Sequence, residues 1–168
     1  MAVAVLKNLA QAWQGRGHSD PPGVTADVQR YVIYGLYLAV WWIAVQRSHD
    51  TPTVVLAAGA VAILSGSGIA LSAMWTLGRS YRERIDPGED GVLQTTGVFG
   101  WMRHPMRVGL TVELIGTTVC SQEWVALVLT LGVGVLLVQR SREEEALLAA
   151  RYGAAYAHYR ETTPAIPM

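Results

Sequence analysis

Four apolar stretches alternate with polar segments along the chain, at residues 31–46, 53–77, 106–120 and 124–139. A helix needs about 20 apolar residues to cross a bilayer, so the stretch 53–77 is long enough to span outright. The other three have 15 to 16 residues, and each alone is also compatible with a buried helix of a soluble protein. Flanking arginines that snorkel and local thinning of the bilayer let such stretches cross. The pattern predicts an all-α fold with about four transmembrane helices.

The distribution of basic residues favours the membrane interpretation. If the four helices run up and down from a cytoplasmic N-terminus, Arg47 is the one basic residue of thirteen that falls outside. This asymmetry is the positive-inside pattern, which a soluble bundle has no reason to adopt. We therefore predict an integral membrane protein with both termini cytoplasmic, in a bacterial inner membrane. The cytoplasmic set is Lys7, Arg16, Arg30, Arg79, Arg82, Arg84, Arg103, Arg107, Arg140, Arg142, Arg151 and Arg160.

Composition narrows the function classes. Hydrophobic residues make up 51% of the chain and charged residues 15%, against about 25% charged in soluble domains. The formal net charge is zero, so we expect no nucleic-acid partner. Cys120 is the single cysteine and the four histidines are scattered, so we expect neither a disulfide nor a metal site.

The segments outside the spans give the domain organisation. Leu6, Leu9 and Trp13 share one helical face, which fits an interfacial helix or, equally, a frayed terminus. Residues 142–159 have helical spacing and are expected to continue from the fourth span or to bend away from it. We expect one membrane domain, 1–168: an interfacial segment 1–27, four spans over 28–141 with a cytoplasmic loop 78–105, and a cytoplasmic C-terminal helix and tail 142–168.

Small residues inside two of the spans suggest close helix packing. Gly59, Gly66 and Gly68 lie in the second stretch, and Gly132 and Gly134 lie in the fourth. Small residues let membrane helices approach each other closely. The Gly-Ser-Gly run at 66–68 is not a dinucleotide-binding loop, because it lies inside an apolar span with no strand before it.

Two charged clusters flank the last two apolar stretches. Arg103-His104-Pro105 precedes the third, and Arg-Ser-Arg-Glu-Glu-Glu at 140–145 follows the fourth. One hairpin through the bilayer brings both clusters to the same water interface, where a polar cofactor can meet a lipophilic substrate. The arginines are also compatible with simple positive-inside anchors, and the glutamates with a solvated helical turn. Glu113 lies inside the third stretch, where a carboxylate is costly and needs a partner such as Arg140 or Arg79, or a ligand.

The order and spacing of these residues resemble a known group of enzymes. Arg103-His104-Pro105 is followed by a span, by Arg140-x3-Glu144-Glu145, and by tyrosines at 152, 156 and 159. Together they resemble the isoprenylcysteine carboxyl methyltransferase and phospholipid methyltransferase family of integral membrane enzymes, over residues 75 to 167. The resemblance implies an S-adenosylmethionine pocket at the cytoplasmic ends of the last two spans, closed by the C-terminal helix.

The resemblance also implies roles for individual residues. Arg140 and Glu144 would lie nearest the reacting groups. Arg107 stands where the family usually has tyrosine, and it would hold an anionic group of the substrate, with Glu113 a second candidate contact. The residues implied in cofactor binding are Gly97, Val98, Arg103, His104 and Pro105 on one wall, and Glu145, Tyr152 and Tyr156 on the other.

The chemistry of the cofactor agrees with this set. Carboxylates can hold its amine and ribose, while arginine and backbone N–H groups can hold its carboxylate. Methyl transfer to an anionic nucleophile depends on alignment and exclusion of water. A phenol, thiol or amine acceptor would need a base, for which Glu144 or His104 is a candidate.

The resulting hypothesis is an S-adenosylmethionine-dependent methyltransferase acting on a lipophilic small molecule or a prenylcysteine-type carboxylate. The acceptor would enter laterally from the membrane lipids. A membrane NADPH-dependent reductase of related helical architecture is an alternative, which the Arg140-x3-Glu144-Glu145 pattern argues against. A non-catalytic membrane scaffold is another, which Arg107 and Ala165 would favour as departures from the family pattern.

Overall fold

The computed structural model describes residues 24–78 and 93–166, and within these ranges every regular element is helical. The expectations for the N-terminal interfacial helix and for Arg79, Arg82 and Arg84 lie outside the described residues. The elements are α2 (Val24–Arg47), η1 (Ser48–Asp50), α3 (Thr53–Leu77), η2 (Gly97–Gly100), α5 (Pro105–Ser121), α6 (Trp124–Tyr152) and α7 (Ala154–Thr162).

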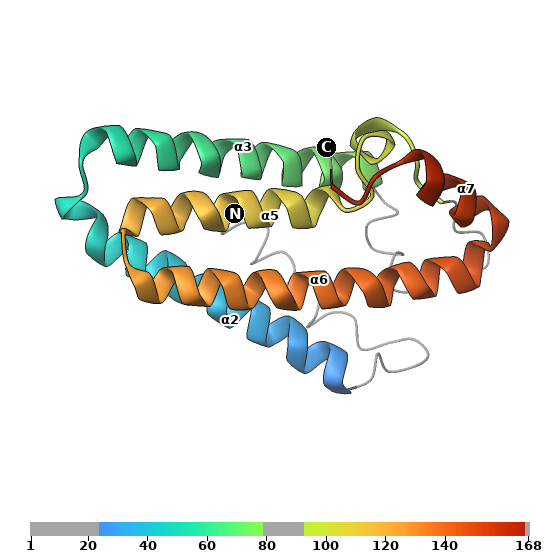
Figure 1. Cartoon of the computed structure of the whole chain (residues 1–168), viewed down its shortest axis with the longest axis horizontal. Helices are drawn as coiled ribbons and strands as arrows, with labels where there is room; N and C mark the ends of the chain where they lie inside the picture. Colours follow the sequence, from blue (N-terminus) through green and yellow to red (C-terminus); the bar gives the residue numbers. More distant parts are fainter. Residues whose placement is uncertain (1–23, 79–92, 167–168) are drawn as a thin grey trace.

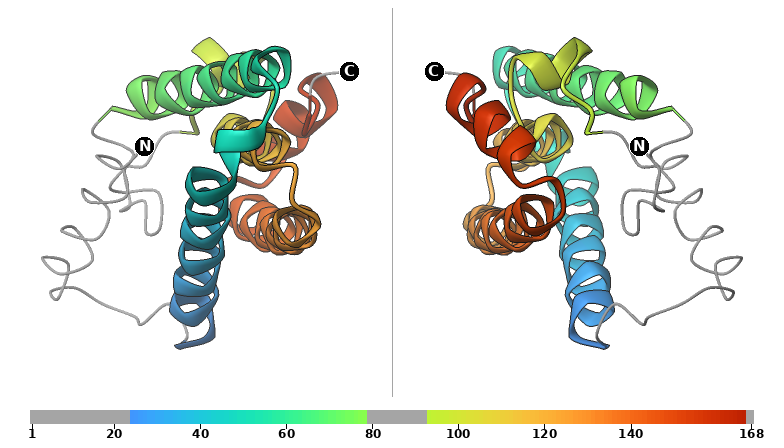
Figure 2. Two further views of the ribbon diagram at one scale, coloured as in Figure 1. Left: turned by 90° about the vertical axis from the view of Figure 1, so that its left-hand side faces the viewer. Right: turned by 90° about the vertical axis from the view of Figure 1, so that its right-hand side faces the viewer.

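The short helix α5 is the centre of the bundle. It contacts α2, α3 and α6, and α3 lies along it in the side view (Figure 1) and beside it in both end views (Figure 2). Val40 of α2, Leu114 of α5 and Val133 of α6 are fully buried in the apolar core between their helices. A second cluster, formed by Ala73, Leu77 and Phe99, joins the end of α3 to η2. These contacts place α5, the third predicted span, between the other three long helices.

Glycines set the distance between α3 and α5. A Cβ on Gly66 would lie 2.5 Å from the Gly109 carbonyl oxygen, and one on Gly116 would lie 2.7 Å from the Gly59 carbonyl oxygen. The two backbones therefore touch, as expected for small residues at a membrane helix contact. The same expectation is wrong for three other glycines, which face open space: Gly68, Gly132 and Gly134.

Within residues 24–78 and 93–166, three helical segments are long and apolar enough to cross a membrane: Val28–Arg47, Thr53–Leu77 and Trp124–Tyr152. Large apolar side chains such as Trp42, Val54 and Leu64 point outward along them, which suits a lipid environment. α5 has 17 residues, at the lower limit of the roughly 17 to 25 that span a bilayer. The described part of this integral membrane protein is therefore all-helical, and the count of four spans stays a prediction.

The predicted fourth span is the first part of a longer helix. α6 continues without a break to Tyr152, so residues 142–152 extend it, and the C-terminal helix α7 is shorter than expected. Residues 140–151 are mostly Arg, Glu, Ala and Leu, which favour helix. The helix ends at Gly153, whose φ of +50° is readily adopted only by glycine. α7 folds back from that point over the end of the bundle (Figure 1).

Candidate active site

The two charged clusters meet where α5 begins. Pro105 occupies the first turn of α5, a position that suits its fixed φ and missing N–H group. Arg103 and His104 therefore lie just before the helix and Arg107 lies in its first turn. The facing part of α6 carries Ser141, Glu144 and Glu145. The sequence prediction that one hairpin joins the clusters is thus consistent with the structure.

Glu145 is held by the Arg-His-Pro segment. Its Oε1 atom lies 3.1 Å from Nη1 of Arg103 and 3.0 Å from Nε2 of His104. His104 is buried, and Arg103 and Glu145 are largely buried. The His104 hydrogen bond and the Arg103 ion pair together hold the Glu145 carboxylate in one orientation.

Arg107 makes the second link between α5 and α6. Its Nη1 donates to Ser141 Oγ over 2.7 Å and to His104 Nδ1 over 3.1 Å, and its Nη2 pairs with Glu144 Oε2. Ser141 was not predicted as a site residue, although it lies inside the charged cluster that the sequence marks. We refer to Arg103, His104, Arg107, Ser141, Glu144 and Glu145 as the ion-pair network.

The hydrogen bonds of the network settle the tautomer of His104. Arginine can only donate, so Nδ1 of His104 accepts from Arg107, and Nε2–H donates to Glu145. Burial, followed by the Arg107 charge, lowers the pKa of His104 below its usual 6.5. The imidazole is therefore neutral at physiological pH.

The C-terminal helix α7 closes this end of the bundle. Tyr156 is fully buried, and its ring packs edge-on against Tyr159 at a centroid distance of 6.1 Å. Tyr159 donates from its hydroxyl to the Phe99 carbonyl over 2.7 Å, and the Arg103 N–H donates to the Pro164 carbonyl over 2.9 Å. Burial and the nearby Glu145 charge raise the pKa of Tyr156, so its phenol stays protonated.

Buried polar atoms in the site allow a test of the implied cofactor. Arg103 and the Tyr156 hydroxyl face each other, and neither Arg103 Nε nor the Tyr156 hydroxyl makes a well-aligned hydrogen bond among the described residues, although both are buried. Such donors are costly to leave unpaired and call for a ligand or water. A guanidinium, a phenol and the Glu145 carboxylate suit the carboxylate, hydroxyl and amine groups of S-adenosylmethionine, so the residues present fit that cofactor.

Other predicted site residues lie around the network. Gly97, with φ +62°, begins η2 against Thr76, and Val98 packs on the cluster of Ala73, Leu77 and Phe99. Arg140 and Tyr152 lie on α6, one turn before Glu144 and two turns after it, and both are half-buried.

Glu113 lies deeper in α5 and is fully buried. Its carboxylate faces Tyr37 of α2 and Ser67 of α3, rather than the expected Arg140. Glu113 therefore belongs to a separate polar position inside the bundle, while Arg79, the other expected partner, lies outside the described residues.

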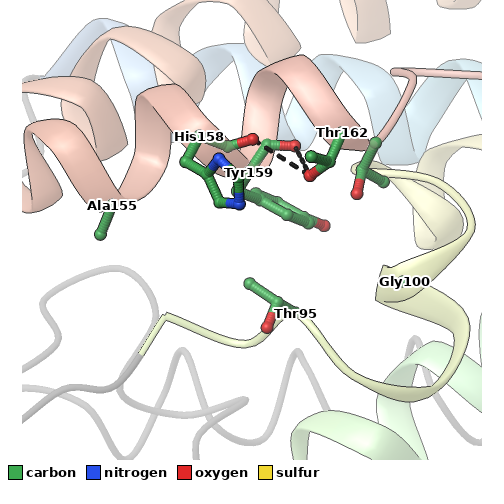
Figure 3. A pocket seen from close by; sticks show the side chains of 7 residues that line it. Thr95, Gly100, Ala155, His158, Tyr159 and Thr162 are labelled. Atoms are coloured by element: carbon green, nitrogen blue, oxygen red, sulfur yellow. Dashed lines mark hydrogen bonds between the residues drawn. The ribbon is translucent and has the colours of Figure 1, made fainter.

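A groove that sequence reasoning missed lies between α7 and the segment leading into η2 (Figure 3). It has a volume of about 380 Å³. Figure 3 shows Thr95 across from His158 and Thr162, and Thr162 donates to the His158 carbonyl over 3.0 Å. The groove shares α7 with Tyr156 but none of the network residues line it. Its lining is Thr95, Gly100, Ala155, His158, Tyr159, Thr162 and Thr163.

Comparison with known proteins identifies the family. Residues 54–155, more than half of the chain, match the family model described as phospholipid methyltransferase. Protein-S-isoprenylcysteine O-methyltransferase of Schizosaccharomyces pombe is 31% identical over 107 residues, which cover 61% of this chain and 45% of that protein. The proteins of the same name from Rattus norvegicus and Xenopus laevis are each 31% identical, over 64% and 63% of this chain and 39% and 38% of their own lengths.

The chain spans less than half the length of these curated relatives. No solved structure matches it. The matched region runs from α3 into α7 and contains the whole ion-pair network, where the sequence resemblance had placed its motif. On this evidence the chain belongs to the phospholipid methyltransferase family.

Proposed function

We propose that the chain transfers a methyl group from S-adenosylmethionine to a lipophilic small molecule or a prenylcysteine-type carboxylate at the cytoplasmic membrane face. The observation that carries this proposal is the ion-pair network, which presents two carboxylates and two guanidiniums beneath the buried Tyr156. The family match and the methyltransferase names of three relatives support the same chemistry.

The proposed division of roles follows the chemistry of each group. Arg103, Tyr156 and Glu145 would hold the cofactor, together with His104 and the backbone near Pro105. The bound cofactor supplies an electrophilic methyl group. The protein then has to align that group with the acceptor and exclude water, which suits a site covered by a helix. Further cofactor contacts proposed from the sequence are Gly97, Val98 and Tyr152.

Arg140 and Glu144 are proposed to lie nearest the reacting groups, because they occupy successive turns of α6 at the same end of the bundle. Arg107 and Glu113 stay predicted acceptor contacts. In the structure both have neighbours within the chain: Glu144 and Ser141 for Arg107, and Tyr37 for Glu113.

The proposed orientation puts the network on the cytoplasmic side, with both termini there and with a bacterial inner membrane as the location. Supporting this, Arg103, Arg107, Arg140 and Arg142 gather at one end of the bundle, whereas Arg47 lies at the other end of α2. Lipid surrounds the spans, so the acceptor is proposed to enter between helices from the bilayer.

Calorimetric titration of the detergent-purified protein with S-adenosylhomocysteine tests the proposal. We expect saturable binding by the wild type, loss of binding in Glu145→Gln, and wild-type binding in Glu143→Gln, because Glu143 is exposed and lies two residues away on the same helix. Absence of binding by the wild type would contradict the proposed cofactor. Methyl incorporation into lipid extracts from labelled S-adenosylmethionine then identifies the acceptor.

A further inference from the structure

Arg107 is the residue that connects the two halves of the ion-pair network. On one side of the network Arg103 and His104 contact Glu145, and on the other Arg107 contacts Glu144 and Ser141. The Arg107 guanidinium contacts Ser141 and Glu144 of α6, and it also donates to the imidazole of His104. The Arg107 side chain is 18% exposed, so these contacts are sheltered from water. The Arg107 side chain thus links His104 to both Ser141 and Glu144 of α6.

This coupling fixes the state of His104. Because a guanidinium has donors and no acceptor, it forces Nδ1 to be unprotonated and leaves the proton on Nε2, which is directed at Glu145. A different residue at position 107 removes that constraint. The ring could then take either tautomer or a second proton.

The charges around His104 also indicate that Arg107 keeps the imidazole neutral. The charged groups that face it are Arg107 from α5, Glu144 and Glu145 from α6, and Arg103 from the preceding turn, with the neutral phenol of Tyr156 nearby on α7. Two positive and two negative charges balance around a neutral ring. Removal of Arg107 leaves an excess negative charge, which protonation of the buried imidazole would neutralise.

We propose that Arg107 is a positioning residue that acts through His104, holding the imidazole as the neutral Nε2–H donor that orients Glu145. The inference rests on the proposed function for its catalytic meaning, since Glu145 is there a cofactor contact. One consequence follows for the acceptor chemistry. Both ring nitrogens of His104 are engaged, so His104 is not the base that a phenol, thiol or amine acceptor would require.

Nitrogen NMR of the protein with ¹⁵N-labelled histidine tests the proposal directly. The His104 signals are assigned by their loss in His104→Gln. In the wild type we expect the neutral Nε2–H pattern and a titration midpoint below that of an exposed histidine. In Arg107→Met we expect a higher midpoint and loss of the single tautomer. Unchanged His104 signals in a folded Arg107→Met protein would overturn the proposal.

Arg107→Lys keeps the experiment decisive if the methionine variant fails to fold. Lysine retains the charge but cannot donate from a rigid fork to His104 and Glu144 together. We expect the lysine ammonium to pair with Glu144 and to leave Nδ1 of His104 without a donor, so the His104 midpoint stays low while the tautomer becomes mixed. A wild-type tautomer pattern in the lysine variant contradicts the role of the guanidinium geometry.

Binding of S-adenosylhomocysteine connects this role to the site. We expect Arg107→Met to weaken binding about tenfold, comparable to the loss of one charge-assisted hydrogen bond. The matched control is Arg160→Met, an exposed arginine on α7, which should bind as the wild type does. A wild type that does not bind contradicts the proposed function, whereas equal binding by both variants contradicts the positioning role.

Discussion

At the scale of single residues, the three consecutive glutamates of α6 differ because a helix turns about 100° per residue. Glu144 pairs with Arg107, Glu145 pairs with Arg103 and His104, and Glu143 is exposed. The sequence motif predicted that these charges would meet. It could not assign partners, because the rotation of α6 relative to α5 depends on the apolar core between them. Ser141 escaped prediction for the same reason.

The lowered pKa of His104 makes stability depend on pH. The neutral ring is favoured in the folded state, so its contribution is fully present above the usual pKa of 6.5. As the pH falls below that value, the unfolded chain takes up the proton first and stability declines. We expect the thermal unfolding midpoint to fall between about pH 7.5 and pH 5.5, and to fall less in His104→Gln. The exposed His158→Gln serves as the control, and equal slopes in all three proteins would refute the prediction.

The Tyr159 hydroxyl holds α7 to η2. Tyr159→Phe leaves the buried Phe99 carbonyl without this donor, and we expect a loss of about 1 to 2 kcal/mol of stability. Because Tyr156 is carried by the same helix, binding of S-adenosylhomocysteine should weaken too. Thermal unfolding and calorimetry measure both effects. Tyr31→Phe, at an exposed position of α2, should change neither, and a Tyr159→Phe protein as stable as this control would show that the bond is unimportant.

At the scale of the elements, the contact between α3 and α5 is made by backbone rather than by side chains. The sequence predicted that glycines in two spans lie at helix contacts. It could not predict which helix each glycine contacts, because glycine has no side chain whose chemistry would indicate a partner. The structure separates Gly59 and Gly66, which touch α5, from Gly68, which faces open space on the same helix. Which glycines make contacts therefore depends on where α5 lies, and the sequence of α3 alone does not contain that information.

Alanine substitutions on α3 test the contact with a matched pair. In Gly66→Ala the new Cβ would lie 2.5 Å from the Gly109 oxygen and 2.6 Å from the Glu113 nitrogen, so the helices must separate. We expect a loss of about 1 to 3 kcal/mol. Gly68→Ala meets nothing within 4 Å and should be neutral or stabilising by up to about 1 kcal/mol. Unfolding midpoints in one detergent compare them, and equal midpoints would show that α3 is not held by this contact.

At the scale of the whole molecule, hydrophobic pattern and positive-inside asymmetry were enough to predict a helical membrane protein, and the family resemblance placed the charged motif at one end. Hydrophobicity marked the apolar part of α6 but left open whether the helix continues beyond it or bends away. Helix continuation depends on backbone propensity, which stays favourable through the charged residues up to Gly153. The sequence also predicted α5 as a span, and its 17 residues, surrounded by other helices, leave that prediction open.

The proposed orientation is testable with single cysteines in a Cys120→Ser background. His49→Cys lies in the turn between α2 and α3, and Ile166→Cys lies near the C-terminus, and both positions are exposed. With intact cells, a membrane-impermeant maleimide should label His49→Cys. It should label Ile166→Cys only after the membrane is opened. The reverse result would invert the topology and put the ion-pair network outside.

The length of α6 has a consequence for how the protein responds to its surroundings. Its 29 residues make a rod of about 44 Å, while the hydrocarbon core is about 30 Å thick. In the proposed orientation the part beyond the lipid carries Glu144 and Glu145, and it is continuous with the part inside. A thicker or thinner bilayer changes the tilt of such a rod, and tilt displaces its far end the most. We therefore expect the lipid composition of the host membrane to act, through the tilt of α6, on the spacing between Glu144 and Glu145 and their basic partners.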